Sequence, residues 1–396
     1  MLKYTPFHPR TSALMEGQAW RRWAGHLVAS SYELTHDREY AAIRNAAALI
    51  DVTPLYKYSV AGPDAGRLLD RVIVRDVAKL KVGQVYYTPW CDAQGKVIDD
   101  GTLARLDERT FRMTAADPSL RWLSMNAVGM DVTVADATDT TCALALQGPS
   151  ARAILERATQ SKEATGLKFF RIVPATIAGV PVTVSRTGYT GDLGYEIWMP
   201  AERAVDVWDA IASAGQRYGL APCGIWAMDV ARIEAGLIMA DVDYVSSHKA
   251  LIEAQKSSPF ELGLGWCVNL EKAPFVGKKA LVAEKRDGSP WQFVGIDVDW
   301  DSLESVYAEV DLPPRLPTIA WRVSVPLYAE GRQVGYASSG CWSPLLKRYI
   351  ALAHIETFWS KPGTLVEMEV TVEHRRKKAL ARVAETPFFN PERKRS

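Results

Sequence analysis

Residues 86–101 read YYTPWCDAQGKVIDDG, and this stretch decides the fold. Val85 to Trp90 is rich in aromatic and β-branched residues, and Lys96 to Leu106 predicts a returning strand after the turn DAQG. Because successive strand residues point to opposite faces, Asp99 and Asp100 place one carboxylate on each face of this hairpin. If one face is core, one of the two acids is buried or lines a cavity. The alternative is that both lie near the end of the strand, in water.

Helices and strands are mixed on both sides of the hairpin. Apolar spacing and capping signals predict helices, with Asp64 as an N-cap and Gly148-Pro149-Ser150 as a helix start. The predicted helices cover residues 37–49, 65–73, 151–158, 201–218 and 229–236. Strands are predicted at 180–186 and 195–199, and residues 131–147 are predicted to form a β pair.

The C-terminal quarter of the chain has a different character. An acidic, proline-containing stretch covers residues 297–317, and short strand patterns separated by turn residues follow it. These patterns lie at 322–328, 333–338, 350–354, 365–372 and 379–383. The chain is therefore predicted to be α+β, with a mixed body over residues 1–287 and a β-rich domain, sandwich or barrel, over 288–396.

Composition excludes several classes of function. The 396 residues include 47 Lys+Arg and 46 Asp+Glu, so the chain lacks the basic field of a non-specific nucleic-acid binder. No apolar run approaches the roughly 18 residues of a membrane span. Residues 1–23 lack a signal-peptide core, and the five cysteines form no CxxC, so we expect a cytoplasmic protein. Nucleotide-binding fingerprints and histidine pairs at metal-ligand spacing are also missing, so no metal is expected.

A second candidate site residue follows the glycine-rich segment SRTGYTGDLGY, which ends at Tyr195. In the predicted strand after it, Tyr195, Ile197 and Met199 share one face, whereas Glu196 and Trp198 share the other. A carboxylate beside an indole ring can bind a flat heterocycle, because the acid accepts two hydrogen bonds from an amino-pyrimidine edge. The alternative is an exposed glutamate on an ordinary strand.

These segments, in this order, resemble the aminomethyltransferase family, whose best-known member is the T-protein of the glycine cleavage system. The resemblance extends over most of the chain in one register, and its most specific parts are SRTGYTGxxGxE and the hairpin with its two acids. It is carried by IDVTPLYKYSVAGPDA (50–65), YYTPWCDAQGKVIDDG (86–101), ALQGP (145–149), SRTGYTGDLGYEI (185–197), ARIEAG (231–236), ELGLGWCVNLEKAPFVGKKAL (261–281) and GYASSGCWSPLLKRYIALAHI (335–355).

The resemblance implies a three-lobed, cloverleaf-like fold with a C-terminal barrel or jelly-roll-like domain and tetrahydrofolate in a central cavity. It implies that Asp100 is the catalytic acid beside the reacting folate nitrogens and that Glu196 holds the amino edge of the pterin. The other cofactor-binding residues expected from it are Tyr189, Tyr87, Val97, Ile98, Met228 and Trp226. The expected partners are a small one-carbon donor and, for a true T-protein, a lipoyl carrier protein.

One departure from the family pattern bears on the reaction. Met228 stands where the family usually has an arginine that helps to bind folate, and this change makes the pocket more apolar. Transfer of a one-carbon unit from an amine donor to tetrahydrofolate is the first hypothesis. O- or S-demethylation giving 5-methyl-tetrahydrofolate is the second, since Trp90, Trp198 and Trp226 suit an apolar or cationic methyl donor. A non-catalytic folate-binding regulator is the third. The sequence does not identify the donor, the oxidation level of the carbon, or the oligomeric state.

Overall fold

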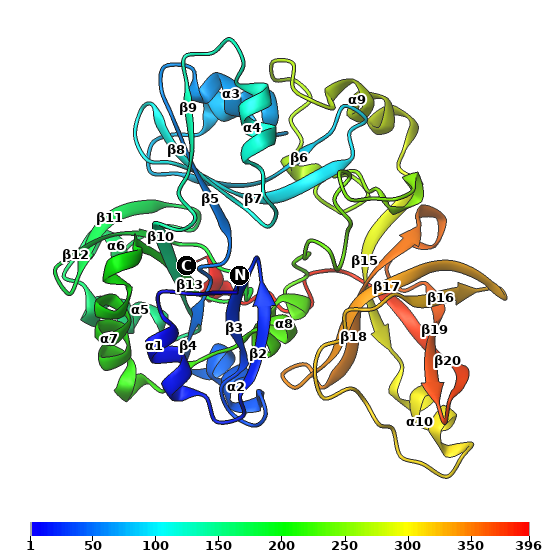
Figure 1. Cartoon of the computed structure of the whole chain (residues 1–396). Helices are drawn as coiled ribbons and strands as arrows, with labels where there is room; N and C mark the ends of the chain where they lie inside the picture. Colours follow the sequence, from blue (N-terminus) through cyan, green and yellow to red (C-terminus); the bar gives the residue numbers. More distant parts are fainter. Residues whose placement is uncertain (1, 396) are drawn as a thin grey trace.

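The structure, a computed structural model, describes residues 2–395 and has the predicted α+β composition. Three lobes surround a common centre (Figure 1). Two of the lobes are each built on an open sheet, and the third contains a closed six-stranded barrel. The three-lobed arrangement and the C-terminal barrel implied by the family resemblance are therefore confirmed.

The first lobe holds the hairpin that carries the two acids. Its five-stranded sheet has the order β6-β7-β8-β5-β9, and helix α3 (Ala65–Val72) buries Leu68, Leu69 and Val72 against it. The predicted hairpin is confirmed, with Pro89 opposite Asp100 in the antiparallel register. The bounds are β5 Tyr56–Ala61, β6 Val85–Cys91, β7 Val97–Arg105, β8 Thr110–Ala115, β9 Thr133–Asp136 and α4 Leu120–Asn126.

The second lobe is a six-stranded sheet with a helical layer on each face. Its order is β11-β12-β13-β10-β4-β14. Helices α5, α6 and α7 pack on one face, and α2 and α8 pack on the other. The bounds are β4 Ala47–Asp51, β10 Thr141–Gln147, β11 Ile172–Ile177, β12 Val180–Ser185, β13 Gly194–Pro200, β14 Leu220–Pro222, α2 Asp37–Asn45, α5 Ala151–Ala158, α6 Lys162–Thr165, α7 Ala204–Gly215 and α8 Ile225–Glu234.

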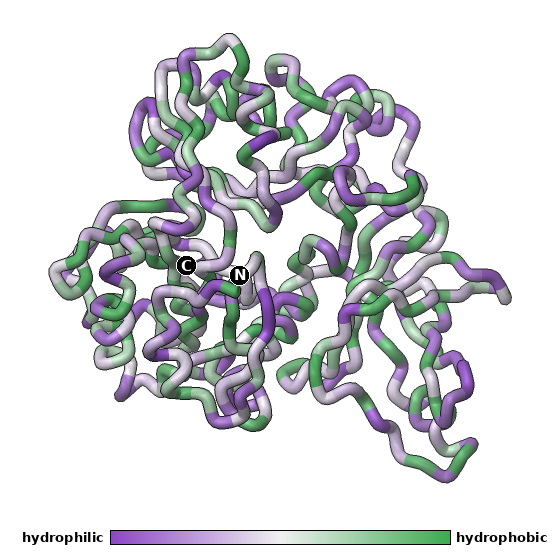
Figure 2. The backbone as a smooth tube through the Cα atoms, viewed as in Figure 1, coloured by the Kyte–Doolittle hydropathy of each residue, from purple (hydrophilic) through white to green (hydrophobic). Residues whose placement is uncertain are grey.

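The N-terminal segment adds a small three-stranded sheet to the second lobe. Helix α1 (His8–Thr11) follows β1 (Lys3–Tyr4), and the hairpin of β2 (Ala19–Trp23) and β3 (His26–Ser31) lies beside the centre of the molecule (Figure 1). Figure 2 shows β2 as a hydrophilic stretch in this position, because it carries two consecutive arginines.

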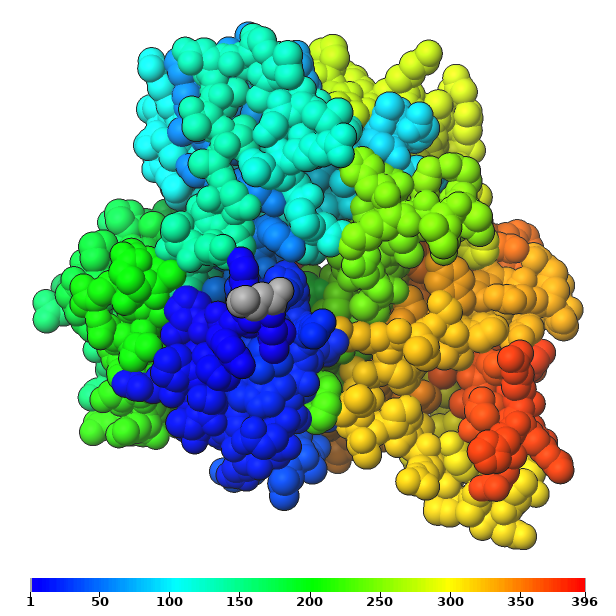
Figure 3. Space-filling model, in the orientation of Figure 1, coloured from blue at the N-terminus to red at the C-terminus, as the bar shows by residue number. Residues whose placement is uncertain are grey.

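The third lobe is the barrel, with strand order β15-β18-β17-β16-β19-β20. Helix α9 (Lys278–Asp287) precedes it, and α10 (Trp300–Ala308) lies between its first two strands in the chain. In Figure 3 the gold atoms that follow α10 meet the blue atoms of the N-terminal region. The strand bounds are β15 Trp291–Val298, β16 Val325–Ala329, β17 Arg332–Ser343, β18 Arg348–Glu356, β19 Leu365–Val372 and β20 Arg375–Ala384.

The structure corrects three local predictions. The helix expected over 37–49 ends at Asn45, because residues 47–50 are fully covered on both sides and form a central strand, β4. The two strands within 131–147 are present but do not pair, since β9 joins the first lobe and β10 the second. Asp64 does not cap α3 with its side chain and instead accepts from the N–H of Asp131 at 2.9 Å. Within residues 2–395, no helix has both the length and the apolar character of a bilayer span.

Candidate functional site

The two consecutive aspartates point to opposite faces of β7, as the strand alternation predicts. Asp99 is fully buried, and its Oδ1 and Oδ2 accept from the backbone N–H groups of Asp100 (2.8 Å) and Asp117 (2.9 Å). The Asp100 carboxylate faces the other way and accepts from the Tyr244 hydroxyl at 2.5 Å. The alternative in which both acids are solvated is therefore wrong. Asp99 holds the local backbone, and Asp100 remains as the partly exposed acid.

Burial and hydrogen bonding shift the pKa of Asp100 in opposite directions. Burial raises its pKa, whereas hydrogen bonds from the hydroxyls of Tyr244 and Tyr87 lower it. Burial, with the negative charge of Asp100, also raises the pKa values of both tyrosines well above 10. The two phenols consequently stay protonated at neutral pH and keep donating to the acid. The Tyr244 hydroxyl thus holds the carboxylate, and Tyr87 acts on its pKa from the neighbouring strand.

Glu196 and Trp198 share one face of β13, as predicted; Glu196 is partly exposed, whereas Trp198 is buried. Thr187 Oγ1 donates to Glu196 Oε2 at 2.6 Å, and the Arg112 guanidinium lies 4.3 Å from the centroid of a Trp198 ring. Burial raises the pKa of Glu196, while the Thr187 hydrogen bond and the charge of Arg112 lower it. Burial lowers the pKa of Arg112 to about 10, and the charge of Glu196 opposes this change. Within residues 2–395 no hydrogen bond reaches Glu196 Oε1, so this oxygen is free to accept from a ligand.

Two side chains connect the acids of the two sheets. Arg112 comes from β8 of the first lobe and bonds Thr183 of the second lobe at 2.9 Å. Tyr189, from the glycine-rich loop, donates to the carbonyl of Ile238; burial raises the pKa of its hydroxyl, and the negative charges of Asp243 and Asp100 raise it further. These contacts place Asp100 and Glu196 on two sheets that meet, rather than on separate surfaces.

The other expected cofactor-binding residues lie in different surroundings. Met228 is buried on α8 in the cluster that includes Trp198, against which Tyr189 packs. Val97 belongs to a cluster with Tyr244, and its backbone N–H and carbonyl are both occupied by neighbouring loops. Ile98 lies in the core of the first lobe. Their contacts with folate stay predictions.

Trp226 is not brought together with the two acids. It lies on the face of α8 opposite Met228 and contacts His36 edge-on, with ring centroids 6.3 Å apart. It lines a groove of about 700 Å³ at the junction of the second lobe and the barrel, where Trp300 and Trp342 also lie. The packing of a folate ring against Trp226 therefore has no geometric support from the other site residues.

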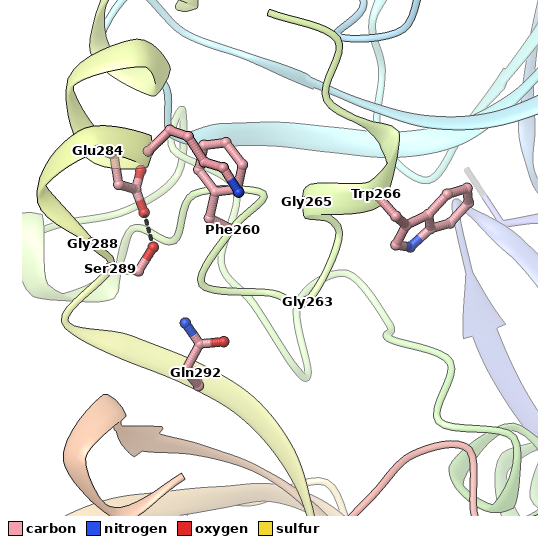
Figure 4. A pocket seen from close by; sticks show the side chains of 9 residues that line it. Phe260, Gly263, Gly265, Trp266, Glu284, Gly288, Ser289 and Gln292 are labelled. Carbon is pink, nitrogen blue, oxygen red and sulfur yellow. Dashed lines mark hydrogen bonds between the residues drawn. The ribbon is translucent and has the colours of Figure 1, made fainter. Parts of the chain in front are cut away.

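A second hollow of about 410 Å³ lies near the hairpin (Figure 4). Glu284 accepts from Ser289 Oγ at 2.5 Å on one side of this hollow, and Trp266 stands on the other side. The exposed Trp266 ring stacks on Tyr87, with centroids 6.3 Å apart and an interplanar angle of 22°. The aromatic wall of the Asp100 site thus continues to the molecular surface.

Sequence reasoning did not find several residues that shape the site. Tyr244 and Thr187 lie in segments without a periodic pattern, and no local signal marks them as partners of the acids. Arg112 was detectable in principle, because it lies opposite Ala104 in the β7–β8 register and so shares the strand face of Asp100. Finding it requires knowledge of which strands pair.

Comparison with known proteins finds matches that cover most of the chain. The family model "GCVT N-terminal domain" matches residues 8–272, and "Glycine cleavage T-protein C-terminal barrel domain" matches residues 310–390. An aminomethyltransferase of Desulforamulus reducens is 31% identical over 395 residues, covering 99% of both chains. A trimethylamine-oxide aldolase of Ruegeria pomeroyi is 32% identical over all of this chain but 48% of its own length. The crystal structure of glycine cleavage system aminomethyltransferase T from Bartonella henselae matches with a TM-score of 0.82 and 26% identity, covering 98% of this chain and 99% of that one.

Proposed function

Because the chain belongs to the aminomethyltransferase family, that of the glycine cleavage T-protein, we propose that it is an enzyme that transfers a one-carbon unit from an amine-type donor to tetrahydrofolate. The observation that carries the proposal is the pair of partly exposed carboxylates, Asp100 and Glu196, on two sheets that meet at the centre. The relatives described above give no support to O- or S-demethylation, and we do not pursue that alternative.

The residues present fit a reduced pterin. The amino-pyrimidine edge of such a ring presents N–H donors, and Glu196 Oε1 is an acceptor that no group within residues 2–395 occupies. The other oxygen of Glu196 is fixed by Thr187, so the carboxylate is oriented before a ligand arrives. Arg112 helps to keep it ionised despite its burial. Glu196 would therefore hold the amino edge of the ring.

Tetrahydrofolate, when bound, supplies the nucleophilic nitrogens and carries the transferred carbon. Asp100 would face these nitrogens, where a carboxylate can accept a proton or stabilise positive charge that develops during transfer. The hydroxyl of Tyr244 holds the carboxylate in one orientation, and it stays protonated while doing so. Tyr189 and Met228 would border the ring with apolar surface.

The donor and partners belong to the proposal as well. An amine that carries an N–CH2 group is the expected small donor, and a lipoyl carrier protein would deliver it if the chain acts within a glycine cleavage system. Met228 stands where the family usually has an arginine, and this departure bears on whether the chain carries out the glycine cleavage reaction itself. A donor other than the lipoyl-bound aminomethyl group is consistent with this change.

The proposal is tested with the purified protein, tetrahydrofolate and a panel of aminomethyl compounds (amines that carry N–CH2–X, where X is a leaving group), methyl ethers and methyl sulfonium compounds. We expect only the aminomethyl compounds to react, giving 5,10-methylene-tetrahydrofolate with loss of X and of the amine, because their carbon already has the oxidation level of the product. Formation of 5-methyl product from an ether or sulfonium would instead establish a demethylase. Calorimetry of tetrahydrofolate binding provides the second readout. The Glu196→Gln variant should bind at least about tenfold more weakly, because a neutral amide replaces a charged acceptor. Absence of binding to the unmodified protein would contradict the proposal.

A further inference from the structure

We propose that Arg393, near the C-terminal end of the chain, is a positioning residue for pterin binding. It binds Asp192 and thereby holds the glycine-rich loop between β12 and β13, residues 186–193, in the conformation that orients Glu196. The inference deepens the proposed function and rests on it, because the ligand whose affinity it governs is the reduced pterin ring.

The last segment of the chain leaves the barrel and returns to the second lobe. After β20 ends at Ala384, residues 385–395, which we call the C-terminal strap, run from the barrel back toward β13 (Figure 1). The N–H of Phe389 donates to the carbonyl of Glu234, the last residue of α8, at 2.8 Å. The Phe389 ring also covers the guanidinium of Arg44 on α2, 4.4 Å from the ring centroid. The strap is therefore docked on two helices of the second lobe before it reaches the loop.

Arg393 of the strap binds the loop through a bidentate ion pair. Its Nε and Nη2 donate to the two oxygens of Asp192 at 2.7 and 2.8 Å. In the other direction Arg186, the first residue of the loop, donates to the carbonyl of Arg393 at 3.2 Å. The Asp192 side chain is fully buried, whereas that of Arg393 is 40% exposed, and Arg44 lies 3.6 Å from Asp192 as a second cation. Arg393 can therefore be substituted without leaving the buried carboxylate unpaired.

Asp192 in turn fixes the backbone of the loop. Its Oδ1 accepts from the N–H of Leu193 at 2.7 Å. The Arg44 guanidinium, beside Asp192, donates to the carbonyl of Thr190 at 2.8 Å. Gly191, between these two held residues, has a φ of +73°, a conformation that favours glycine. Side chains from two distant segments thus hold a stretch of backbone whose glycine has unusual conformational freedom.

The same loop orients the carboxylate that is proposed to bind the pterin. Thr187 Oγ1 donates to Glu196 Oε2 at 2.6 Å. Gln147 connects Thr187 with the part of the loop that Asp192 fixes, because its Oε1 accepts from Thr190 Oγ1 at 2.9 Å and its Nε2 donates to the Thr187 carbonyl at 3.3 Å. A displacement of Asp192 is therefore transmitted to Thr187, and Glu196 loses the hydrogen bond that orients it.

The expected effect is on ligand affinity rather than on the chemical step. A carboxylate that is no longer oriented before the ligand arrives must be ordered during binding, and this ordering weakens affinity. Asp100 lies on β7 of the first lobe, and within residues 2–395 it shares no hydrogen bond with the loop or the strap. Substitution of Arg393 should consequently raise the KM for tetrahydrofolate and leave kcat at saturation nearly unchanged.

The test measures pterin binding to the full chain by isothermal calorimetry. The ligands are tetrahydrofolate and 6-methyltetrahydropterin, which lacks the glutamate tail, so a direct contact between Arg393 and the tail is distinguished from an effect on the ring. The variants are Arg393→Gln, Arg393→Lys, Asp192→Asn and the double variant. Arg395→Gln is the matched control, because it removes the same charge from the strap at an exposed side chain that has no hydrogen bond or ion pair within residues 2–395. Thermal midpoints are measured for every variant.

We expect Arg393→Gln to weaken binding of both ligands at least about fivefold, and Arg395→Gln to change it less than about twofold. Arg393→Lys should recover part of the loss, because it keeps the charge but not the bidentate geometry. Adding Arg393→Gln to Asp192→Asn should weaken binding by less than about twofold more, because the contact is already broken. The midpoint of Arg393→Gln should stay within a few degrees of that of the unmodified protein.

Three results would overturn the inference. The first is unchanged binding of 6-methyltetrahydropterin by Arg393→Gln, which includes the case in which only tetrahydrofolate binds more weakly. The second is an equal loss in Arg393→Gln and Arg395→Gln, which would be a general effect of charge. The third is full additivity of the Arg393 and Asp192 substitutions. Failure of the proposed function has a different signature, because the unmodified protein then binds neither ligand.

Discussion

At the scale of single residues, substitutions of the two consecutive aspartates should have different effects: one on turnover, the other on stability. Asp100 accepts from Tyr244 on the side of β7 that is partly exposed, so its carboxylate is available to a ligand. We predict that Asp100→Asn lowers turnover at least about tenfold, or ~1.4 kcal/mol in barrier height, because the amide can neither accept a proton nor stabilise a cation. The thermal midpoint should stay near that of the unmodified protein. Unchanged turnover would remove Asp100 from the mechanism.

The raised pKa of Asp100 also predicts how activity and stability change with pH. Burial raises the pKa of Asp100 above its ordinary value of 3.8, so the reactive carboxylate is lost at a higher pH than for an exposed aspartate. We expect kcat/KM to fall with falling pH on a limb that lies above pH 4 and is absent in Asp100→Asn. The free energy of unfolding depends on pH in the opposite sense, because the folded state binds the proton of Asp100 more tightly than the unfolded state does. The contribution of Asp100 to stability is therefore full at low pH and is lost as the pH rises through its raised pKa. An acid limb at the ordinary value would contradict this.

Asp99 should affect stability rather than turnover. Both of its carboxylate oxygens accept backbone N–H groups inside the protein, from Asp100 and Asp117. In Asp99→Asn one oxygen becomes an NH2 group, which points at an N–H donor and leaves it unpaired. We predict a loss of about 1–3 kcal/mol in the free energy of unfolding, measured by urea denaturation. A variant with full stability and low turnover would reverse the roles assigned to the two acids.

At the scale of elements, the β7–β8 contact depends on Gly101, the glycine next to Asp100. A Cβ at Gly101 would overlap the carbonyl oxygen of Thr114 on the neighbouring strand. We predict that Gly101→Ala destabilises the protein by about 1–3 kcal/mol or more, seen as a lower thermal midpoint. Gly66→Ala is the matched control: its nearest contact is Phe111 at 3.9 Å, and it lies in α3 with an ordinary backbone. The control should be neutral or stabilising by up to about 1 kcal/mol.

Elements were predictable where local chemistry determines them. The acid-bearing hairpin and the glycine-rich loop before β13 follow from turn residues and strand alternation, and both appear in the structure. Helix α10 was missed, because the acidic, proline-containing composition of residues 297–317 hides a short helix capped by Asp299. The fully buried strand β4 was taken for helix, since it lacks alternation when both of its faces are covered.

The candidate site was predictable only in part, because only some of its residues are marked by local sequence. Asp100 and Glu196 stand out because acids are rare in strands and because the family resemblance points to them. Tyr244, Thr187 and Arg112 do not, since their roles arise from contacts between segments far apart in the chain. Trp226 was expected in the pocket from the family resemblance, yet the helical period of α8 turns it away from Met228.

At the scale of the whole molecule, α8 is the element that joins the barrel to the other lobes. Asp243, just beyond α8, accepts from Ser338 (2.5 Å) and Ser339 (2.7 Å) of β17 and also pairs with Arg232. Glu234 accepts from Ser343 of the same strand and from Arg44 of α2 at 2.6 Å. Buried charges that are shared across lobes couple their unfolding. The division of the chain at residues 287 and 288 stays a proposal, with β15 beginning at Trp291.

This coupling leads to a prediction for Asp243→Asn. Arg232 is fully buried, and its remaining carboxylate, Asp229, is already shared with Arg322, so the variant leaves a buried charge undercompensated. Removing one partner from a buried pair typically destabilises by about 3–5 kcal/mol. We expect such a loss in urea denaturation, with tryptophan fluorescence and circular dichroism giving coincident transitions. Asp241→Asn is the control, because its ion pair with Lys249 at 2.7 Å is exposed and contributes about 0–1 kcal/mol. Equal losses in the two variants, or a barrel transition separate from the rest in the unmodified protein, would show that the network does not join the lobes.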